Sequence, residues 1–376
     1  MSRILHVITM LGAGGAEHLL VDLLPLLREK GDDVDLLLLD GVETPFKDAL
    51  RQKGIKIFEL SKGEDVNDFS KVYDLSCIVK LRKFIGQYDI IHTHNTACQF
   101  FVPLSRMLTS ARTILVTTEH SPNNRRREKR WWIPLDKWMY NQYAAVICIS
   151  DQTRTNLERH IGEKSNIHTI YNGVDIGRFL RPVKSIKGQT QFVITMVAGL
   201  RAEKDHETLL KAMTLLPDSY CLQLVGGGEK EAYLKSYCKE LGLENRISFL
   251  GVRLDVPDLL EKSDVVVLSS HWEGLSLSSI EGMASGRPFI ASDVGGLRAI
   301  VKDAGVLFPK GDEHALAESI MNLCNDPGLY EQVASRCQEK ARKYDISAMV
   351  DGYLELYKSL MSSNYANTMT TIESKA

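Results

Sequence analysis

Short apolar runs alternate with stretches of helical periodicity along most of the chain. In the N-terminal half the apolar runs predict strands at 3–9, 33–39, 55–60, 89–93, 113–117, 145–149 and 168–170. A second series predicts strands at 192–198, 221–225, 247–250, 264–268, 288–291 and 305–308. The stretch between the first two strands, 16–30, has helical spacing and ends at Gly31, a common helix C-cap residue. Such alternation is typical of α/β folds with parallel sheets covered by helices.

The chain is long enough for two domains. It has 376 residues, more than one ordinary hydrophobic core accommodates. The segment 177–191 is polar, carries Pro182 and Gly188 and has no clear periodicity, as a linker would. We therefore predict two doubly wound, Rossmann-like domains facing a cleft: an N-terminal domain at 1–176, a linker at 177–191 and a C-terminal domain at 192–348. A final helix at 349–362 and a flexible tail at 363–376 complete the prediction.

Two glutamates flank a predicted strand-to-helix turn in the second series. Glu273 follows the buried strand 264–268, and Glu281 lies eight residues further on, inside a helix that starts near Ser278. Open α/β sheets bind ligands at the carboxyl ends of their strands. The N–H groups of residues 276–279 lie at a helix N-terminus, where phosphate binds well. The order of a carboxylate, an anion-binding helix N-terminus and a second carboxylate would suit, in turn, a sugar, a diphosphate and a ribose.

This turn resembles the E-x7-E motif of retaining glycosyltransferases of family 4, which have the GT-B fold. The family usually reads E-G-x-G-L-P-x-x-E, whereas Ser276 and Ser278 stand here for its second glycine and its proline. The resemblance covers essentially residues 1–360. It implies that Glu273 contacts the donor sugar, that Glu281 binds the ribose and that the last helix crosses back to the first domain. The donor-binding segment it implies consists of Glu273, Gly274, Ser276, Leu277, Ser278 and Glu281. The alternative for Glu281 is a capping box with Ser278.

A pair of cations follows the first strand of the second series. Arg201 and Lys204 lie in the loop after 192–198, and Arg and Lys suit the neutralisation of a departing diphosphate. The alternative is a solvated loop that opens a helix. The family has its catalytic cations at this position, so the resemblance implies that Arg201 and Lys204 bind the donor and stabilise its leaving group.

A glycine-rich loop follows the first strand of the chain. Glycines allow the backbone to approach a ligand closely, and the resemblance implies that Gly14 and Gly15 close over the donor phosphate. The same G-x-G pattern occurs in dinucleotide oxidoreductases, and Asp40 ends the second strand as a ribose-binding acid would. Position 17 is Glu instead of the third glycine of that fingerprint. An oxidoreductase therefore stays open as an alternative.

Histidines mark the ends of two strands in the first series. His120 follows the strand 113–117, and the resemblance implies that it lies near the reacting sugar. His92 and His94 share one face of the strand 89–93 and its extension. Their H-x-H spacing raises the question of a metal, but no nearby carboxylate or cysteine completes a ligand set, so we predict no metal site. We interpret His92 as a core or cleft-lining group and place His94 and Asn95 on the acceptor side.

A basic and aromatic segment follows His120 in the sequence. Five cations lie within six residues and adjoin tryptophans: Arg125, Arg126, Arg127, Lys129 and Arg130, followed by Trp131, Trp132 and Trp138. Such a pairing occurs where proteins lie on anionic bilayers. Alternatives are a groove for a charged acceptor, a domain-closing helix or an ordinary solvated surface.

Composition narrows the possible partners and cellular location only slightly. The chain is 44% apolar and 25% charged with a net charge of −2, so nothing indicates nucleic acid as a partner. Its seven cysteines show no C-x-x-C pair, which favours the reducing cytoplasm. The apolar stretch at 4–11 is short and contains His6, so we expect a strand there and no signal peptide. No apolar run reaches the about 18 residues of a membrane span.

These features together predict a cytoplasmic glycosyltransferase, with peripheral contact to the inner face of the cell membrane as an interpretation of the basic segment. The resemblance implies a retaining, metal-independent hexosyltransferase without a cofactor. It would move a sugar from a nucleotide-diphosphate donor, UDP-linked in our interpretation, to a hydroxyl of a glycan or glycolipid in surface polysaccharide synthesis. Alternatives are a sugar-nucleotide epimerase of the same fold, a nucleotide-dependent oxidoreductase and a non-catalytic sugar-nucleotide sensor.

Overall fold

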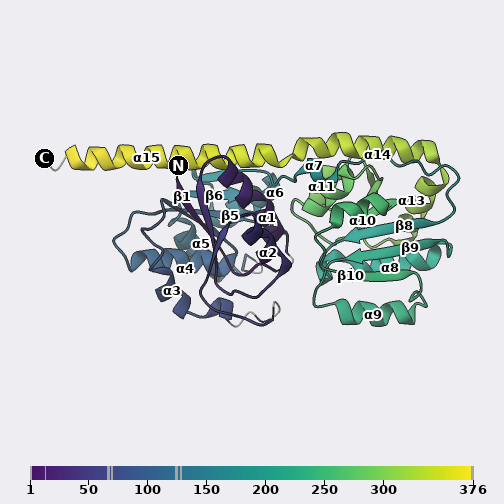
Figure 1. The fold of residues 1–376 in the computed structure, drawn as a ribbon, viewed down its shortest axis with the longest axis horizontal. Helices are drawn as coiled ribbons and strands as arrows, with labels where there is room; N and C mark the ends of the chain where they lie inside the picture. The colour runs from purple at the N-terminus through teal and green to yellow at the C-terminus, as the bar shows by residue number, and fades with distance from the viewer. Residues whose placement is uncertain are drawn as a thin grey trace. The chain divides into compact units, whose positions relative to one another are not determined.

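The computed structural model describes residues 2–12, 14–65, 68, 71–122, 126–127 and 129–373. The chain forms two compact units, one of Met1–Asn172 with Ser347–Ala376 and one of Gly173–Ile346. Each unit contains one parallel β-sheet with its own helices (Figure 1). The predicted α/β fold class with two doubly wound units is confirmed.

The first unit is built on a seven-stranded sheet with the order β3-β2-β1-β4-β5-β6-β7. Its strands are β1 (Arg3–Ile8), β2 (Asp33–Leu38), β3 (Lys56–Glu59), β4 (Ile90–His94), β5 (Ile114–Glu119), β6 (Ala145–Cys148) and β7 (Ile167–Thr169). Its α-helices are α1 (Gly15–Glu29), α2 (Pro45–Gln52), α3 (Ser76–Leu81), α4 (Thr96–Met107), α5 (Ile133–Tyr140), α6 (Asp151–Ile161) and α15 (Ile346–Glu373). The short 3-10 helices are η1 (Lys71–Tyr73) and η2 (Arg130–Trp132).

The second unit is built on a six-stranded sheet with the order β10-β9-β8-β11-β12-β13. Its strands are β8 (Phe192–Val197), β9 (Tyr220–Val225), β10 (Ile247–Gly251), β11 (Val265–Leu268), β12 (Phe289–Ser292) and β13 (Val306–Phe308). Its α-helices are α7 (Ile176–Phe179), α8 (His206–Leu215), α9 (Glu231–Glu240), α10 (Val256–Lys262), α11 (Leu277–Ala284), α12 (Gly295–Val301), α13 (Glu313–Asn325) and α14 (Pro327–Ala341). The 3-10 helices are η3 (Ala202–Lys204) and η4 (Arg342–Tyr344).

Burial of the strands explains why the sequence pattern predicts them well. Every residue of β4, β5, β6, β11 and β12 is buried, as expected for parallel strands that are covered on both faces. Each of the thirteen predicted strands is present, with ends that differ by two residues or fewer. The predicted helix at 16–30 corresponds to α1.

The segment 177–191, which the sequence predicts as a linker, packs within the second unit. The Arg181 guanidinium lies 2.7 Å from a carboxylate oxygen of Glu261, and Arg287 donates to the Pro182 carbonyl oxygen at 3.0 Å. The boundary between the units falls instead between Asn172 and Gly173. The polar residues of this segment, which suggest a solvated linker, make ion pairs and hydrogen bonds within the second unit. Such contacts cannot be predicted from the sequence, because the segment has no helical or strand periodicity.

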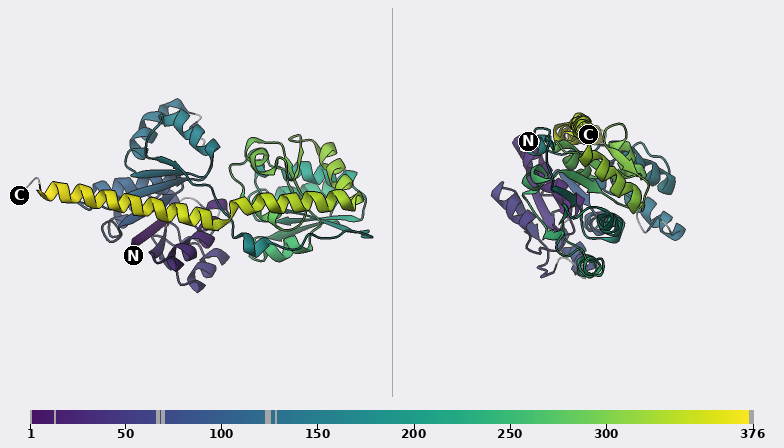
Figure 2. Two further views of the ribbon diagram at one scale, coloured as in Figure 1. Left: turned by 90° about the horizontal axis from the view of Figure 1, so that it is seen from above. Right: turned by 90° about the vertical axis from the view of Figure 1, so that its right-hand side faces the viewer.

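The C-terminal helix α15 belongs almost entirely to the first unit, which includes the chain from Ser347 onward. Figure 2 shows this helix, in yellow, lying along that unit. Its fully buried Tyr353 and Tyr357 face the sheet: the Tyr357 hydroxyl lies 2.5 Å from His92 Nδ1, and the Tyr353 hydroxyl lies 3.3 Å from Thr118 Oγ1. The helix continues to Glu373, beyond the end at residue 362 that the sequence predicts.

We expect Tyr357→Phe to lower the free energy of unfolding by about 1–3 kcal/mol, because the buried His92 Nδ1 loses its partner. Urea denaturation would measure this as a lower midpoint at an unchanged slope. Tyr233→Phe is the matched control, since Tyr233 is 50% exposed and should change stability by less than about 0.5 kcal/mol. Equal midpoints for the two variants would contradict a stabilising role for the Tyr357 hydroxyl.

Candidate active site

The second unit brings two predicted segments together at the carboxyl ends of adjacent strands. β8 pairs with β11, although β9 and β10 come between them in the sequence. This is the point at which the strand order reverses, where doubly wound sheets bind their ligands. The loop with Arg201 and Lys204 follows β8, and the loop with Glu273 follows β11.

Hydrogen bonds fasten these two loops to each other. The Ser269 hydroxyl donates to the Asp205 carbonyl oxygen at 2.8 Å, and the His271 backbone N–H donates to the Glu203 carbonyl oxygen at 2.8 Å. Asp205 has a left-handed backbone with φ of 48° and caps α8, where its carboxylate accepts from Thr208. Both loops therefore have fixed positions relative to the sheet.

Lys204 and Glu273 form an ion pair at the centre of this arrangement. The Lys204 Nζ lies 2.5 Å from Glu273 Oε1, and the Ser270 hydroxyl donates to the same oxygen at 2.7 Å. The Glu273 side chain is only 9% exposed and that of Lys204 is 21% exposed. Arg201 differs, since it is exposed and has no ion-pair partner among the described residues. An exposed guanidinium next to a held ammonium is suited to binding phosphate oxygens.

The helix α11 directs its N-terminus toward the same end of the sheet. Ser276 is its N-cap residue, and within the described part of the chain its hydroxyl does not cap the helix but lies 3.1 Å from the Ser278 hydroxyl. The first N–H groups of the helix, at Leu277 and Ser278, are therefore suited to donate hydrogen bonds to an anion. Gly274 lies in the turn between Glu273 and this helix.

The start of α11 argues against the capping-box alternative for Glu281. A capping box joins the N-cap residue to the third helical residue, which here are Ser276 and Ser279. Glu281 is two residues beyond that position and is 2% exposed. Its contribution to ribose binding stays a prediction.

Glycines that the sequence analysis did not single out shape both loops. A Cβ on Gly226 would lie 2.1 Å from the Ala198 carbonyl oxygen, and one on Gly228 would lie 2.5 Å from that of Leu200. A Cβ on Gly296 would lie 2.2 Å from the carbonyl oxygens of both Glu273 and Gly274. The three consecutive glycines at 226–228 directly follow β9. This run is the sequence signal from which the close approach to the loop after β8 could have been predicted.

In the first unit, Gly14 and Gly15 start α1 at the carboxyl end of β1. Gly14 is the N-cap residue, and the Glu17 carboxylate folds back so closely that a Cβ on Gly14 would lie 2.2 Å from it. Nothing lies within 4 Å of the position of a Cβ on Gly15. This loop follows β1 next to β4, the corresponding reversal point of the first sheet.

His94, Asn95 and His120 lie at the carboxyl ends of β4 and β5. His94 Nδ1 is 2.8 Å from His120 Nε2, so the two predicted histidines are in direct contact. Asn95 has a left-handed φ of 67°, an uncommon conformation for a residue other than glycine, and its amide donates to Thr9 Oγ1 at 3.2 Å. The structure thus gathers the residues that the sequence assigns to the acceptor side and the reacting sugar.

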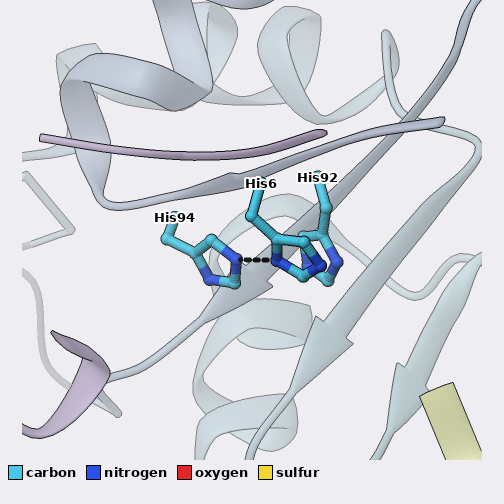
Figure 3. Close-up of side chains that lie close together, drawn as sticks. All are labelled: His6, His92 and His94. Carbon is cyan, nitrogen blue, oxygen red and sulfur yellow. Dashed lines mark hydrogen bonds between the residues drawn. The ribbon is translucent and has the colours of Figure 1, made fainter. Parts of the chain in front are cut away.

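His6 joins this group from β1, where it pairs in register with His92. Its Nδ1 lies 3.0 Å from His94 Nε2, as the dashed line in Figure 3 shows. Burial lowers the pKa of His6 to about 3 and that of His120 to about 4, and it also lowers the pKa values of His92 and His94. All four imidazoles are therefore neutral at pH 7. The sequence analysis read His6 only as part of a strand.

His6, His92 and His94 are close enough together to be considered as metal ligands. Their rings stack, however, with centroids 4.5 Å apart for His92 and His94 and 4.9 Å apart for His6 and His92. Both nitrogens of His92 face hydroxyl groups, those of Tyr357 and Thr118. Stacked and hydrogen-bonded rings do not direct their lone pairs at one point, as a metal site requires. The absence of a metal from the reaction stays a prediction.

Glu119, next to His120, is the centre of a buried network that the sequence analysis did not foresee. Its carboxylate accepts from Gln99 at 2.6 Å, Tyr140 at 2.5 Å and Arg127 at 2.6 Å. Burial alone would raise the pKa of Glu119, but the Arg127 charge and these hydrogen bonds lower it below its usual value. The network fixes the backbone that carries His120.

Two family comparisons cover most of the chain. Residues 13–178 match the family model described as Glycosyltransferase Family 4, and residues 180–344 match the one described as Glycosyl transferases group 1. The chain belongs to glycosyltransferase family 4. Its function is that of a nucleotide-sugar glycosyltransferase in glycan synthesis.

Relatives of this glycosyltransferase match over most of their length. The glycosyltransferase EpsD of Bacillus subtilis is 28% identical over 77% of this chain and 81% of its own. The UDP-Gal:alpha-D-GlcNAc-diphosphoundecaprenol alpha-1,3-galactosyltransferase of Escherichia coli is 25% identical over 94% of this chain and 96% of its own. The crystal structure of Anabaena HepE with UDP and glucose has a TM-score of 0.82 and 24% identity over 96% of this chain and all of that one. This likeness confirms the predicted GT-B fold.

The relatives of this glycosyltransferase do not favour the epimerase and oxidoreductase alternatives. The structure adds an argument against an oxidoreductase, because Asp40, its candidate ribose-binding acid, is only 1% exposed. The Ser61 hydroxyl donates to Asp40 at 3.1 Å, and a Cβ on Gly63 would lie 2.4 Å from the same carboxylate. A loop of the transferase thus covers the acid.

The basic segment of the transferase is only partly available to a partner. Arg127 forms its ion pair with Glu119, and Arg126 lies 2.9 Å from the buried Asp136. The interpretation of the segment as a bilayer-contacting surface therefore does not hold for Arg126 and Arg127, because they pair with buried carboxylates that require partners. Lys129 and Arg130 are exposed. Trp131 is 66% exposed and stacks on Trp132, with the ring centroids 4.5 Å apart. Arg125 lies outside the described residues.

We expect Gly296→Ala to weaken donor binding by the transferase at least about tenfold, because the new Cβ would push the Glu273–Gly274 backbone away from its position. The control is Gly295→Ala, at which a Cβ meets nothing within 4 Å and which should bind donor normally. Isothermal titration with the donor measures both variants. Normal binding by Gly296→Ala would show that this loop does not hold the donor.

Proposed function

We propose that this glycosyltransferase moves a hexose from a UDP-linked donor to a hydroxyl group of a glycan or lipid-linked acceptor, with retention of configuration and without a metal ion. The names of its relatives support the donor and the acceptor. The Escherichia coli relative is named for UDP-Gal and for a diphosphoundecaprenol-linked acceptor, and Anabaena HepE has structures with UDP and with UDP-glucose.

The observation that carries this proposal is the group of charges at the reversal point of the second sheet. Arg201, the Lys204–Glu273 ion pair and the N-terminus of α11 lie at the carboxyl ends of two adjacent strands. In the proposed assignment, Arg201, Lys204 and the N–H groups of Leu277 and Ser278 bind the diphosphate. Glu281 binds the ribose, and Glu273 with Gly274 and Ser276 lies against the sugar.

The proposed reaction takes place on one face of the sugar. The bond between the anomeric carbon and the phosphate oxygen breaks, and the cations stabilise the negative charge that develops on the leaving diphosphate. The acceptor hydroxyl forms the new bond to the anomeric carbon on the same face and transfers its proton to the departing phosphate oxygen. Gly14, Gly15 and His120 contact the donor in this proposal, and His94 and Asn95 lie on the acceptor side.

A thermal-shift screen tests the donor class directly. A sugar nucleotide present at about 100 times its Kd should raise the free energy of unfolding by about 2.7 kcal/mol. We expect UDP-sugars to stabilise the transferase and GDP-sugars and ADP-sugars to leave it unchanged. Stabilisation by another nucleotide alone would overturn the UDP assignment, and binding without turnover by any acceptor would favour a sensor.

We expect Arg201→Ala and Lys204→Ala each to lower turnover by on the order of 10²-fold or more, because both charges act on the leaving diphosphate in the transition state. Lys211→Ala is the matched control, since Lys211 is exposed on α8 in the same unit. Steady-state kinetics with saturating donor measure all three variants.

The same assay shows whether the reaction needs a metal ion and whether it retains the anomeric configuration. Activity should survive EDTA, and the product should keep the anomeric configuration of the donor when it is examined by NMR. Complete loss of activity with EDTA and its return with Mn²⁺ or Mg²⁺ would transfer the neutralising role from the two cations to a metal. An inverted product would contradict the one-face reaction.

We further propose that the exposed part of the basic segment contacts an anionic membrane surface. Lys129, the N-cap residue of η2, is exposed, as are Arg130 and Trp131 on η2 and Leu135 on α5. Cations next to tryptophan suit the interface of a bilayer. Two cations contribute about 1 kcal/mol each near such a surface, so the binding is weak and reversible. No described helix has both the length and the apolar character needed to cross a membrane.

We expect the wild-type protein to sediment with anionic liposomes at low salt and to be released as ionic strength rises, because the attraction is screened over about 8 Å at physiological salt. Charge reversal at Lys129 and Arg130 should abolish sedimentation without loss of turnover on a water-soluble acceptor. Reversal of Lys239 and Lys262, exposed in the second unit, controls for net charge. If the wild-type protein ignores these liposomes, the segment binds acceptor or supports the fold.

A further inference from the structure

Three imidazoles of the first unit form one continuous hydrogen-bonded chain. His6 on β1 contacts His94 on β4 at 3.0 Å, through Nδ1 and Nε2 respectively. His94 in turn contacts His120, which follows β5, at 2.8 Å through Nδ1 and Nε2. Strands β1, β4 and β5 are neighbours in the sheet, so the chain runs across three adjacent strands from the core to the carboxyl end of β5.

The two ends of this chain are its unsatisfied atoms. Among the described residues, His6 Nε2 and His120 Nδ1 are buried and have no hydrogen-bond partner. Both nitrogens of His94 are used within the chain. His6 is fully buried in the sheet, whereas His120 is half-buried at the edge where ligands bind. Both ends of the chain are therefore buried nitrogens, one in the interior of the sheet at His6 and one on the partly exposed His120.

A neutral imidazole carries one N–H donor and one acceptor nitrogen. A chain of three neutral rings therefore has only two arrangements. In the first, each ring is protonated on Nδ1: His6 donates to His94, His94 donates to His120, and His120 keeps a free Nδ1–H. In the second, each ring is protonated on Nε2, every hydrogen bond reverses, and the unused N–H lies on His6.

The surroundings of the two ends favour the first arrangement. A buried N–H without a partner is rarer in proteins than an acceptor without one, and leaving such a group unpaired costs about 1–3 kcal/mol. The second arrangement would leave an N–H permanently unpaired at His6, in the interior of the sheet. The first leaves only an acceptor nitrogen there and places the unused N–H on His120, whose Nδ1 is buried but whose ring is partly exposed at the carboxyl end of β5.

We propose that His94, supported by His6, is a positioning residue that holds His120 in the Nδ1–H tautomer, so that His120 presents a hydrogen-bond donor to its ligand. The tautomer of His120 can be measured in the free protein alone. The identity of the ligand, an oxygen of the donor sugar or its phosphate, rests on the function proposed above.

This tautomer limits what His120 can do in the reaction. An Nδ1–H donates a hydrogen bond to a hydroxyl or phosphate oxygen, but it cannot accept a proton from the acceptor hydroxyl. His120 Nε2 is also unavailable as a base, because it accepts the hydrogen bond from His94. The geometry therefore assigns His120 to binding and charge stabilisation, in agreement with a reaction in which the leaving phosphate takes the proton.

Nitrogen-15 NMR of the ligand-free protein tests the proposal. The chemical shifts of the two imidazole nitrogens distinguish the tautomers, and single substitutions assign the signals among the ten histidines. We expect His6, His94 and His120 all to be protonated on Nδ1 at pH 7.5. Protonation of His120 on Nε2 in the wild-type protein would overturn the proposal.

Three variants separate positioning from mere packing. His94→Leu removes the donor to His120 and should convert the single tautomer of His120 into a mixture. His6→Leu leaves His94 Nε2 as the inner end of the chain, so it should preserve the tautomer of His120 and lower only thermal stability. His92→Phe is the matched control, because His92 stacks within the cluster but bonds to Tyr357 and Thr118.

An unchanged tautomer of His120 in His94→Leu would show that His94 does not position it. A changed tautomer in His92→Phe would show that packing, and not the hydrogen-bonded chain, sets it. If His94→Leu fails to fold, protonation of His120 on Nε2 in the wild-type spectrum would still overturn the proposal. No donor or acceptor is needed, so a failure here is distinct from a failure of the thermal-shift screen that tests the proposed function.

Discussion

The parallel pairing of strands is the constraint on which both groups of candidate site residues, one in each unit, depend. In a parallel sheet every strand runs in the same direction, so the loops that follow the strands emerge at one edge. Register then decides which side chains meet. His6 pairs with His92 across β1 and β4, and the loops after β8 and β11 meet although more than sixty residues separate Lys204 from Glu273. The chemistry of the site is thus a consequence of strand order.

Polar groups at these strand ends are stable because each is held by hydrogen-bond partners from the helices and loops around it. Glu119 accepts three hydrogen bonds, and Glu273 accepts two at a single oxygen. A buried carboxylate without such partners would be strongly destabilising. The hydrogen bonds that make burial tolerable also fix the orientation of each group, which is what a binding site requires. Stability and preorganisation therefore have the same source here.

The sequence predicted the strands well because their burial on both faces leaves a continuous apolar run. The family resemblance implied that Lys204 and Glu273 both bind the donor, and the structure places the two side chains 2.5 Å apart. Features that depend on contacts between distant segments were not accessible in this way. The pairing of Arg127 with Glu119 and the contact of His6 with His94 follow from register and packing. The close approach of Gly296 to the Glu273 backbone also follows from tertiary structure.

The charges of the second unit do not by themselves balance a diphosphate. Arg201 and Lys204 supply two positive charges, Glu273 removes one of them, and the N-terminus of α11 adds about half a charge. In the proposed reaction the leaving diphosphate carries about two negative charges, so part of the developing charge is left for other donors. An ammonium has three N–H groups, so Lys204 can keep Glu273 and also bind a phosphate oxygen. Neutral donors such as an imidazole Nδ1–H or backbone N–H groups at a helix N-terminus can stabilise the remainder without adding a buried cation. A neutral donor fits that requirement better than a further buried cation, because burying another charge would cost more than its attraction returns.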